Sequence, residues 1–378
     1  MDSVFQYFIA LKIVLAANTS WYLWNFRRGL ITEYLRRGHC VWVICPDREM
    51  EVQLTQLGCD ISRVKMISRT ANPFSDFVIF LRFLRLMIVL RPDVFLGFTV
   101  KPFVYGSLAA QIIGAKTVGT ITGLGTAFIR KNWVTRVVKV LYRLATYKMK
   151  TVVFQNQSDL DMFVLQKLVS RCKTVLIPGS GLDLYHYSQK PIKRTRSQDA
   201  PVFLYIGRVL WDKGIGEFVE SARKLKKSHP SAQCQIAGKV DVDNVTAIGK
   251  SQVIKWEKEG VIEYLGFHHD PRGFIEDADC IVLPSYREGL PRSLLEGAAM
   301  GRPLLASDCP GCTDVVVDGV NGFVFRKKST ESLLSAMRRF IKLSFSERQQ
   351  IGTAGRKIVE DRFDQSLVHE AYLKVTTG

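Results

Sequence analysis

The sequence predicts an α/β protein built from two doubly wound parallel-sheet domains. Three observations support this prediction. The length of 378 residues suits two domains. Short apolar runs alternate with helical patterns in each half, and this alternation lapses in the middle of the chain. The composition, 47% apolar and 23% charged, is that of an ordinary soluble globular protein. We therefore expect two similar halves that enclose a cleft, with the chemistry located there.

Short apolar runs mark the strands of the first half. Strands buried on both faces of a parallel sheet are apolar throughout, so such runs favour strands. The predicted strands are Lys12 to Ala17, Cys40 to Cys45, Val94 to Gly97, Thr117 to Ile121 and Thr151 to Gln155. A helical pattern from Phe26 to Arg37, ended by Gly38, joins the first two strands into a βαβ unit.

Residues 178–201 interrupt this alternation with turn-forming and basic residues, which is typical of a linker between domains. The later predicted strands are Val202 to Ile206, Gln233 to Ala237, Glu263 to Leu265, Cys280 to Leu283 and Pro303 to Ala306. We predict two domains, residues 1–182 and 183–360. Residues 361–378 are expected to form a C-terminal helix that packs back on the first domain.

The net charge of +18 is concentrated in the first half of the chain. Residues 1–190 hold 25 Lys and Arg against 11 Asp and Glu, whereas residues 191–378 hold 28 against 24. Such a field favours an anionic partner: lipid headgroups, diphosphates or nucleic acid. The cations are interleaved with aliphatic residues, and zinc-finger spacing and an Arg-rich tail are lacking, which counts against nucleic acid.

The eight cysteines form no framework, and Cys309 and Cys312 make the only C-x-x-C. We expect small buried thiols in a reducing cytosol. The apolar start lacks a basic region, so no signal peptide is expected. The apolar run at residues 77–90 is too short to span a bilayer and carries Arg82 and Arg85, so no transmembrane helix is expected.

Two carboxylates, Glu288 and Glu296, lie eight positions apart in the segment from Pro284 to Pro303. An apolar run precedes this segment and Pro291 suits a first helical position, so we predict strand, loop and helix. Glu288 is then expected over the carboxyl end of a strand, where open α/β sheets bind ligands. Two acceptor-only groups suit a ligand with two sets of hydroxyls, such as a nucleotide-sugar. Solvated surface carboxylates are the alternative.

A second pattern follows the first strand of the second half. That strand ends at Gly207-Arg208, and Lys213-Gly214 opens an amphipathic helix. Backbone N–H groups and the dipole at a helix start favour an anion, which Arg208 and Lys213 can neutralise. The pattern predicts a phosphate site, although a positively charged turn without a ligand is an equal alternative.

The sequence resembles family 4 of the retaining glycosyltransferases through Arg208, Lys213-Gly214, Glu288 and Glu296, and through the run from Pro284 to Phe325. The similarity is strong over residues 200–330 and weaker over the first half. It implies the GT-B fold, two facing Rossmann-like domains with a central cleft. The members that look most similar are bacterial enzymes that build saccharides on a polyprenyl-diphosphate lipid.

The resemblance also implies how the donor sugar is bound. Glu288 would contact the donor hexose, while the backbone amides of Gly289 and Leu290 would approach the sugar and phosphate. Glu296 would bind the ribose diol, as an acid does in dinucleotide sites. The implied donor is a nucleoside-diphosphate sugar, with UDP as the expected nucleotide.

The same resemblance has Gly207, Arg208 and Lys213 hold the diphosphate. Breaking the sugar–phosphate bond places negative charge on the leaving group, which fixed cations stabilise more in the transition state than in the ground state. Arg208, Lys213 and Glu288 are therefore the expected catalytic residues. We expect no metal and no cofactor, because the cations supply the charge and the nucleotide-sugar is itself a substrate.

Two Asp-x-Asp sequences resemble the metal-binding acids of other glycosyltransferases. Asp241-Val242-Asp243 and Asp159-Leu160-Asp161 each follow a predicted strand. Acids favour the start of a helix, so we expect capping or loop roles for both pairs.

The first domain is expected to bind the acceptor, and here the sequence departs from the family. Many members carry a Gly-rich turn after the first strand, where this chain has Asn18-Thr19-Ser20-Trp21. Many also place a histidine facing the donor sugar, but the region beginning at Thr117 has none, so we name no general base. Lys101, Thr122 and Gly123 are the candidate acceptor residues, and a plain surface lysine is an equal alternative for Lys101.

Two basic amphipathic stretches, Phe74 to Leu90 and Lys131 to Lys150, lie in the strongly basic half. Helices of this kind lie in an anionic headgroup layer, although an apolar face that is simply core is the alternative for either one. Together they predict docking to an anionic membrane surface, on the cytoplasmic side of the cell membrane, where a lipid-linked acceptor would be met.

The sequence therefore predicts a metal-independent retaining glycosyltransferase that moves a hexose or N-acetylhexosamine to a polyprenyl-diphosphate-linked saccharide. A transferase with a soluble acceptor, a GT-B epimerase or phosphorylase, and a basic nucleic-acid-binding protein remain as alternatives.

Overall fold

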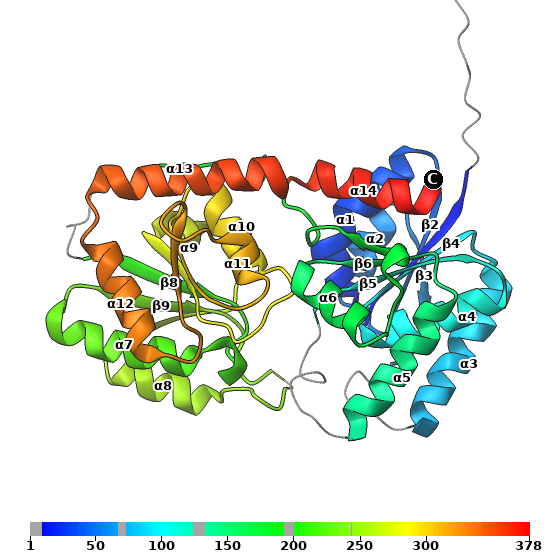
Figure 1. The fold of residues 1–378 in the computed structure, drawn as a ribbon, viewed down its shortest axis with the longest axis horizontal. Helices are drawn as coiled ribbons and strands as arrows, with labels where there is room; N and C mark the ends of the chain where they lie inside the picture. Colours follow the sequence, from blue (N-terminus) through cyan, green and yellow to red (C-terminus); the bar gives the residue numbers. More distant parts are fainter. Residues whose placement is uncertain (1–9, 67–72, 124–132, 193–199, 243) are drawn as a thin grey trace, which may run out of the picture. The chain divides into compact units, whose positions relative to one another are not determined.

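The computed structural model describes residues 10–66, 73–123, 133–192, 200–242 and 244–378, which fall into two compact units. The first unit runs to Ser180 and takes in Ser366–Gly378, whereas the second comprises Gly181–Gln365. Each unit holds one parallel sheet with helices packed on it (Figure 1). The predicted α/β class with two doubly wound sheets is confirmed.

The first sheet has seven parallel strands in the order β3-β2-β1-β4-β5-β6-β7. The strands are β1 (Lys12–Ala16), β2 (Cys40–Cys45), β3 (Asp60–Arg63), β4 (Val94–Phe98), β5 (Lys116–Ile121), β6 (Thr151–Phe154) and β7 (Thr174–Leu176). The helices between them are α1 (Ser20–Arg36), α2 (Glu51–Gln56), α3 (Pro73–Leu90), α4 (Ser107–Ile112), α5 (Trp133–Tyr147) and α6 (Gln157–Leu165), with the short helical turns η1 (Pro102–Gly106) and η3 (Arg171–Lys173).

Separate hydrophobic clusters lie on the two faces of this sheet, as expected for a doubly wound fold. One cluster joins Val14 of β1 with Phe83 of α3, Phe103 of η1 and Tyr142 of α5. The other cluster contains side chains of the opposite strand parity, such as Ile13, together with residues of α1. Alternate side chains of a strand point to opposite faces, so the fully apolar strands feed both clusters.

The second sheet has six parallel strands in the order β10-β9-β8-β11-β12-β13. The strands are β8 (Val202–Ile206), β9 (Gln233–Ala237), β10 (Glu263–Gly266), β11 (Cys280–Leu283), β12 (Leu304–Ser307) and β13 (Gly322–Phe325). The helices are α7 (Ile215–Ser228), α8 (Lys250–Lys258), α9 (Arg272–Asp277), α10 (Arg292–Ala299), α11 (Cys312–Val315), α12 (Thr330–Ile341) and α13 (Phe345–Arg362), with the turn η4 (Trp211–Lys213) before α7.

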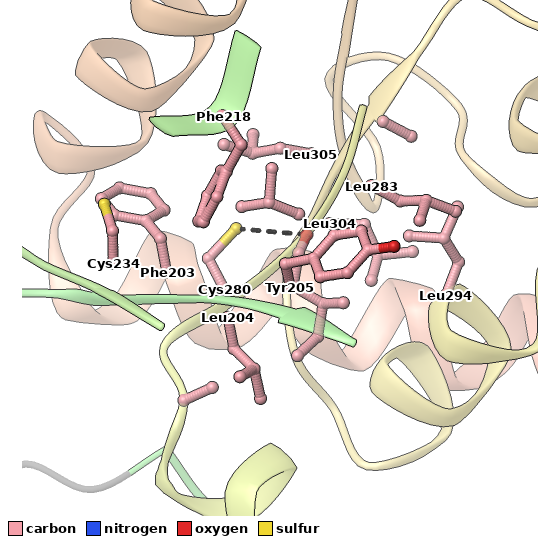
Figure 2. Packing of buried hydrophobic residues seen from close by; sticks show 14 of the residues in the cluster. Phe203, Leu204, Tyr205, Phe218, Cys234, Cys280, Leu283, Leu294, Leu304 and Leu305 are labelled. Carbon is pink, nitrogen blue, oxygen red and sulfur yellow. Dashed lines mark hydrogen bonds between the residues drawn. The ribbon is translucent and has the colours of Figure 1, made fainter. Parts of the chain in front are cut away.

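The core of the second unit joins its central strands to the helices that follow them (Figure 2). Phe203 and Tyr205 of β8 lie beside Cys280 of β11, and Phe218 of α7 and Leu294 of α10 belong to the same cluster. This packing holds the carboxyl ends of β8 and β11 next to each other.

The structure differs from the sequence predictions at several element boundaries. The first helix starts at Ser20 rather than Phe26, because Thr19 caps it and accepts a hydrogen bond from the Tyr22 N–H at 3.1 Å. Strands β3, β7 and β13 were not predicted. β3 and β7 are short and lie at the two edges of the first sheet, where side chains are only partly buried and polar residues are tolerated.

The last helix, α14 (Gln365–Thr377), contributes Tyr372 to the core of the first unit. The Tyr372 hydroxyl is hydrogen-bonded to Thr120 of β5 at 3.0 Å. Tyr372 also lies against the fully buried Arg27 guanidinium, with 5.2 Å from Cζ to the ring centroid, while Phe98 lies on it at 4.3 Å. Aromatic rings therefore stabilise the buried guanidinium, and one of these rings comes from α14.

All eight cysteines are free thiols; six are buried, whereas Cys40 and Cys172 are exposed, contrary to the expectation of buried thiols throughout. Within the described part of the chain, none of the helices combines the length and apolar character needed to cross a bilayer.

We expect Tyr372→Ala to lower the free energy of unfolding of the first unit by about 3–5 kcal/mol, since it removes a buried aromatic ring and opens a cavity. Leu367→Ala on the same helix is the control, because Leu367 is 45% exposed and its truncation changes stability by only about 0.5 kcal/mol. Urea unfolding followed by circular dichroism measures both. Equal effects of the two substitutions would contradict the packing of α14 on the first unit.

Candidate functional site

Two loops meet at one edge of the second sheet, where β8 and β11 pair in parallel. The earlier strands β9 and β10 lie on the side of β8, whereas the later strands β12 and β13 lie on the side of β11. The strand order therefore reverses between β8 and β11. Open parallel sheets bind ligands in the crevice outside the carboxyl ends at such a switch point. Gly207, Arg208 and Lys213 lie in the loop after β8, and Glu288, Gly289 and Leu290 lie in the loop after β11.

The two loops approach so closely that Gly214 has no room for a side chain. Gly214 has a φ of 71°, and a Cβ atom there would lie 2.1 Å from the carbonyl oxygen of Pro284. The Tyr286 N–H donates to the Asp212 carbonyl at 3.0 Å, which ties the loops a second time. Lys213 is thereby fixed beside the end of β11.

The Glu288 carboxylate is held through one of its oxygens. Lys213 Nζ and Ser285 Oγ both donate to Oε1, the serine at 2.5 Å, and the side chains of Lys213 and Glu288 are only 20% and 12% exposed. The Glu288 N–H donates to the Pro310 carbonyl at 3.2 Å. Oε2 accepts no hydrogen bond from a described residue and keeps some solvent exposure, so it is available to a hydroxyl donor.

Ser285 is a site residue that sequence reasoning missed. It is fully buried, and its carbonyl accepts a hydrogen bond from Ser307 of β12. Its position three residues before Glu288 in a strand-end loop is a signal that could have found it, because short hydroxyl side chains favour such local contacts.

The Glu296 carboxylate is also held through Oε1. Tyr187 Oη donates to it at 3.0 Å and Arg292 Nε at 2.7 Å, and the Glu296 side chain is 9% exposed. Oε2 again has no hydrogen-bond partner among the described residues and is not fully buried. Arg292 could have been found from its i, i+4 spacing to Glu296. Tyr187 lies 109 positions upstream and gives no such signal.

Arg208 differs from Lys213 in being exposed. Within the described part of the chain its guanidinium makes no hydrogen bond or ion pair, while its carbonyl accepts from Tyr205 Oη at 2.8 Å. Burial raises the pKa of Tyr205 and the Glu288 carboxylate adds to that shift, so the phenol stays protonated and can keep donating. Lys213 and Arg292 are thus each paired with a carboxylate, whereas Arg208 has no such partner among the described residues.

The candidate acceptor residues all lie in the first unit. Lys101 Nζ pairs with Asp76 Oδ1 at 2.8 Å, and both side chains are largely shielded, so its charge is already balanced. Thr122 and Gly123 directly follow β5 and are half-buried. Leu124 and Gly125, which follow them, lie outside the described residues.

Thr99, directly after β4, has a φ of 63°, which is unfavourable for a β-branched residue. Its Oγ1 accepts from the Asn18 N–H at 3.1 Å, and Asn18 follows the neighbouring strand β1. The strand order of the first sheet reverses between β1 and β4, so this backbone strain lies at a switch point.

The acids of the Asp-x-Asp sequences that the structure describes have local roles. Asn156 caps α6 and accepts from the Asp159 N–H at 2.8 Å, and Asp161 pairs with Arg171 at 2.8 Å. Asp241 Oδ1 accepts from the Lys250 N–H at 3.1 Å, while Asp243 lies outside the described residues. In the described ranges, no three His, Cys, Asp or Glu side chains gather as a metal site requires. Metal independence stays a prediction.

Comparison with known proteins gives matches in both units. Residues 12–156 match the family model described as Glycosyl transferase 4-like, and residues 188–358 match the model described as Glycosyl transferases group 1. The second match contains the loops after β8 and β11.

Two curated relatives match nearly the whole chain. One is the N,N′-diacetylbacillosaminyl-diphospho-undecaprenol alpha-1,3-N-acetylgalactosaminyltransferase of Campylobacter jejuni, 27% identical over 371 residues, with 93% of this chain and 95% of the relative covered. The other is the capsular polysaccharide biosynthesis glycosyltransferase CapM of Staphylococcus aureus, 25% identical over 355 residues, with 91% of each covered. Among solved structures, Anabaena HepE in complex with UDP and glucose is similar in fold, with a TM-score of 0.78, 18% identity and coverage of 96% and 98%.

We expect Gly214→Ala to destabilise the second unit by about 4 kcal/mol or more, because its methyl group would meet the Pro284 carbonyl. Gly260→Ala is a matched control: Gly260 has a φ of 67° but open space around it, so only the left-handed backbone costs about 1–2 kcal/mol. Urea unfolding reported by the fluorescence of Trp211 and Trp256 measures both. Equal losses would show that the two loops are not in close contact.

Proposed function

Because this chain belongs to the glycosyltransferases of the group 1 and 4-like families, we propose that it moves a hexose or N-acetylhexosamine from a UDP-sugar to a polyprenyl-diphosphate-linked saccharide, with retention of the anomeric configuration. The arrangement that carries this proposal is at the switch point of the second sheet. Glu288 lies there in a loop beside Lys213, Glu296 lies on the helix that follows this loop, and each carboxylate has one oxygen without a hydrogen-bond partner among the described residues.

The charges of this site suit a diphosphate leaving group. Arg208 has no partner in the described part of the chain and can pair with a phosphate, and its planar fork suits bidentate contact. Lys213 carries three N–H donors, so it can keep its bond to Glu288 and still donate to a phosphate oxygen. Both cations would stabilise the charge that develops as the sugar leaves, which is why we propose transfer without a metal.

The free Oε2 atoms would bind the hydroxyls at the two ends of the donor. Glu288 would accept from the hexose and Glu296 from the ribose, while the backbone N–H groups of Gly289 and Leu290 approach the sugar and the phosphate. Gly207 would let the backbone pass close to the diphosphate. Retention follows if the acceptor hydroxyl attacks the face that the phosphate leaves and gives its proton to that phosphate.

The acceptor assignment is supported by the relative from Campylobacter jejuni, whose name specifies a diphospho-undecaprenol-linked acceptor. We propose that Lys101, Thr122 and Gly123 help to bind it. The strained Thr99 supports a ligand site at the switch point of the first sheet. Lys101 can take part only if an acceptor phosphate displaces or joins Asp76.

Exposed faces of α3 and α5 support docking to anionic headgroups on the cytoplasmic side of the membrane. The exposed face of α3 has Phe74, Phe77 and Leu81 beside Arg82 and Arg85. On α5, exposed Val137, Val140 and Leu144 alternate with Arg136 and Arg143. Both helices pack against η1 through their other faces, so the sequence alternative of a face that is simply core does not apply to these side chains.

We expect Lys213→Ala and Glu288→Gln to reduce transfer by about 10²–10³-fold, because each removes a group that acts on the donor. Lys224→Ala is the control, since Lys224 forms a Lys–Glu pair with Glu331 on the surface and should retain wild-type rates. Initial rates with UDP-sugars and a lipid-linked acceptor measure this, after thermal-shift screening of nucleotide-sugars has identified the donor through ligand-linked stabilisation. Full activity of Lys213→Ala would contradict the site assignment.

We expect the double substitution Arg82→Gln and Arg85→Gln to weaken binding to vesicles that contain anionic lipid about 30-fold, because each arginine near the surface contributes about 1 kcal/mol. The double substitution Lys255→Gln and Lys258→Gln on α8 removes the same charge from the second unit and should leave binding unchanged. Vesicle sedimentation at two salt concentrations measures both. Failure of the wild type to bind anionic vesicles would favour a soluble acceptor.

A further inference from the structure

Tyr187 connects the Glu296 carboxylate to a segment remote from its own helix. Arg292 and Glu296 both belong to α10, so their ion pair orients the carboxylate only within that helix. Among the described residues, Tyr187 is the one residue outside α10 that donates a hydrogen bond to the Glu296 carboxylate. That segment directly follows the boundary between the units at Ser180 and Gly181.

Tyr187 is itself held firmly. Its N–H donates to the Asp183 carbonyl at 2.9 Å, and its carbonyl accepts from Arg356 Nη1 of α13 at 2.7 Å. The same Arg356 nitrogen donates to the carbonyl of Ala299, the last residue of α10, at 3.0 Å. One guanidinium therefore fixes the Tyr187 backbone relative to the helix that carries Glu296.

The chemistry of the contact suits a fixed donor. Tyr187 is 5% exposed, and burial, followed by the Glu296 charge, raises the pKa of its phenol, so the hydroxyl stays protonated and donates. With two donors on Oε1, the carboxylate cannot rotate freely about its last bond. Its Oε2 then points in one direction and can accept from a neighbouring pair of hydroxyls without first being ordered.

We propose that Tyr187 is a positioning residue for the donor: it orients Glu296 so that Oε2 meets the 2′- and 3′-hydroxyls of the nucleoside, and the protein thereby selects ribonucleotides. This inference rests on the proposed function, in which Glu296 binds the ribose. Tyr187 touches the carboxylate and not the reacting atoms.

Tyr187→Phe tests the inference because it removes the hydroxyl and keeps the ring. The probes are UDP, GDP, ADP and CDP, each compared with its 2′,3′-dideoxy analogue by isothermal titration calorimetry. We expect the substitution to weaken the preferred ribonucleotide about tenfold and to leave its dideoxy analogue unchanged, since that analogue cannot use Glu296. With the donor sugar, the loss should appear in KM rather than kcat, because the ribose contact is the same in the ground and transition states.

A matched control is Tyr34→Phe, which removes another buried tyrosine hydroxyl, bonded to Thr376 at 3.0 Å in the first unit. It should change stability but neither nucleotide affinity nor the preference for ribose. A purely structural role of Tyr187 would weaken the ribonucleotide and its dideoxy analogue equally, and that result would overturn the inference.

The same titrations separate this inference from the proposed function. If the wild type binds none of the four ribonucleotides, or binds each as tightly as its dideoxy analogue, the ribose role of Glu296 is wrong and the inference falls with it. If the wild type prefers ribose and Tyr187→Phe keeps that preference in full, only the role of Tyr187 is wrong.

Discussion

The close approach of Gly214 to the Pro284 carbonyl is the constraint on which the candidate site depends. It brings two loops from different strands within reach, so that the Lys213 ammonium meets the Glu288 carboxylate. Both side chains are mostly shielded from water, and a charge buried in this way is costly unless it is paired. Formation of the ion pair and packing of the loops therefore support each other, and a side chain at residue 214 would disturb both.

The Lys213–Glu288 ion pair affects the net charge of the two loops. Lys213 and Glu288 form an ion pair, so the exposed Arg208 provides the excess positive charge of the two loops, which is the charge that the proposed diphosphate would require. Among the described residues, the donors to both carboxylates bind Oε1. Two protein donors on one oxygen make the burial of each carboxylate tolerable, and under the proposed function the second oxygen would accept from hydroxyls of the donor.

Elements whose structure depends on one local sequence pattern were predicted correctly. The strands Cys40–Cys45 and Cys280–Leu283 were predicted to the residue, because central parallel strands are apolar on both faces. The positions of Glu288 after a strand and of Lys213 before a helix were also predicted from local patterns, and the structure has both, whereas their roles in binding stay predictions. Tyr187 could not be predicted, since tertiary contacts bring it to Glu296, such as those of Arg356 on α13 with the carbonyls of Tyr187 and Ala299. The start of α1 was missed because a single cap at Thr19 outweighs the later apolar periodicity.

The first unit also buries a charged side chain, and there aromatic rings rather than a carboxylate stabilise it. Arg27 is fully buried, and the side-chain partners that the structure gives it are aromatic: Tyr22 from α1, Phe98 from β4 and Tyr372 from α14. Its guanidinium donates to the Tyr22 hydroxyl at 3.1 Å and to the Gly179 carbonyl at 3.5 Å. A buried cation needs partners from several segments, so the end of the chain must return to the first unit before that charge is stabilised. The C-terminal helix is therefore part of the first unit's core. The same arginine also donates to the carbonyl of Gly179, the residue before Ser180 at the boundary between the units.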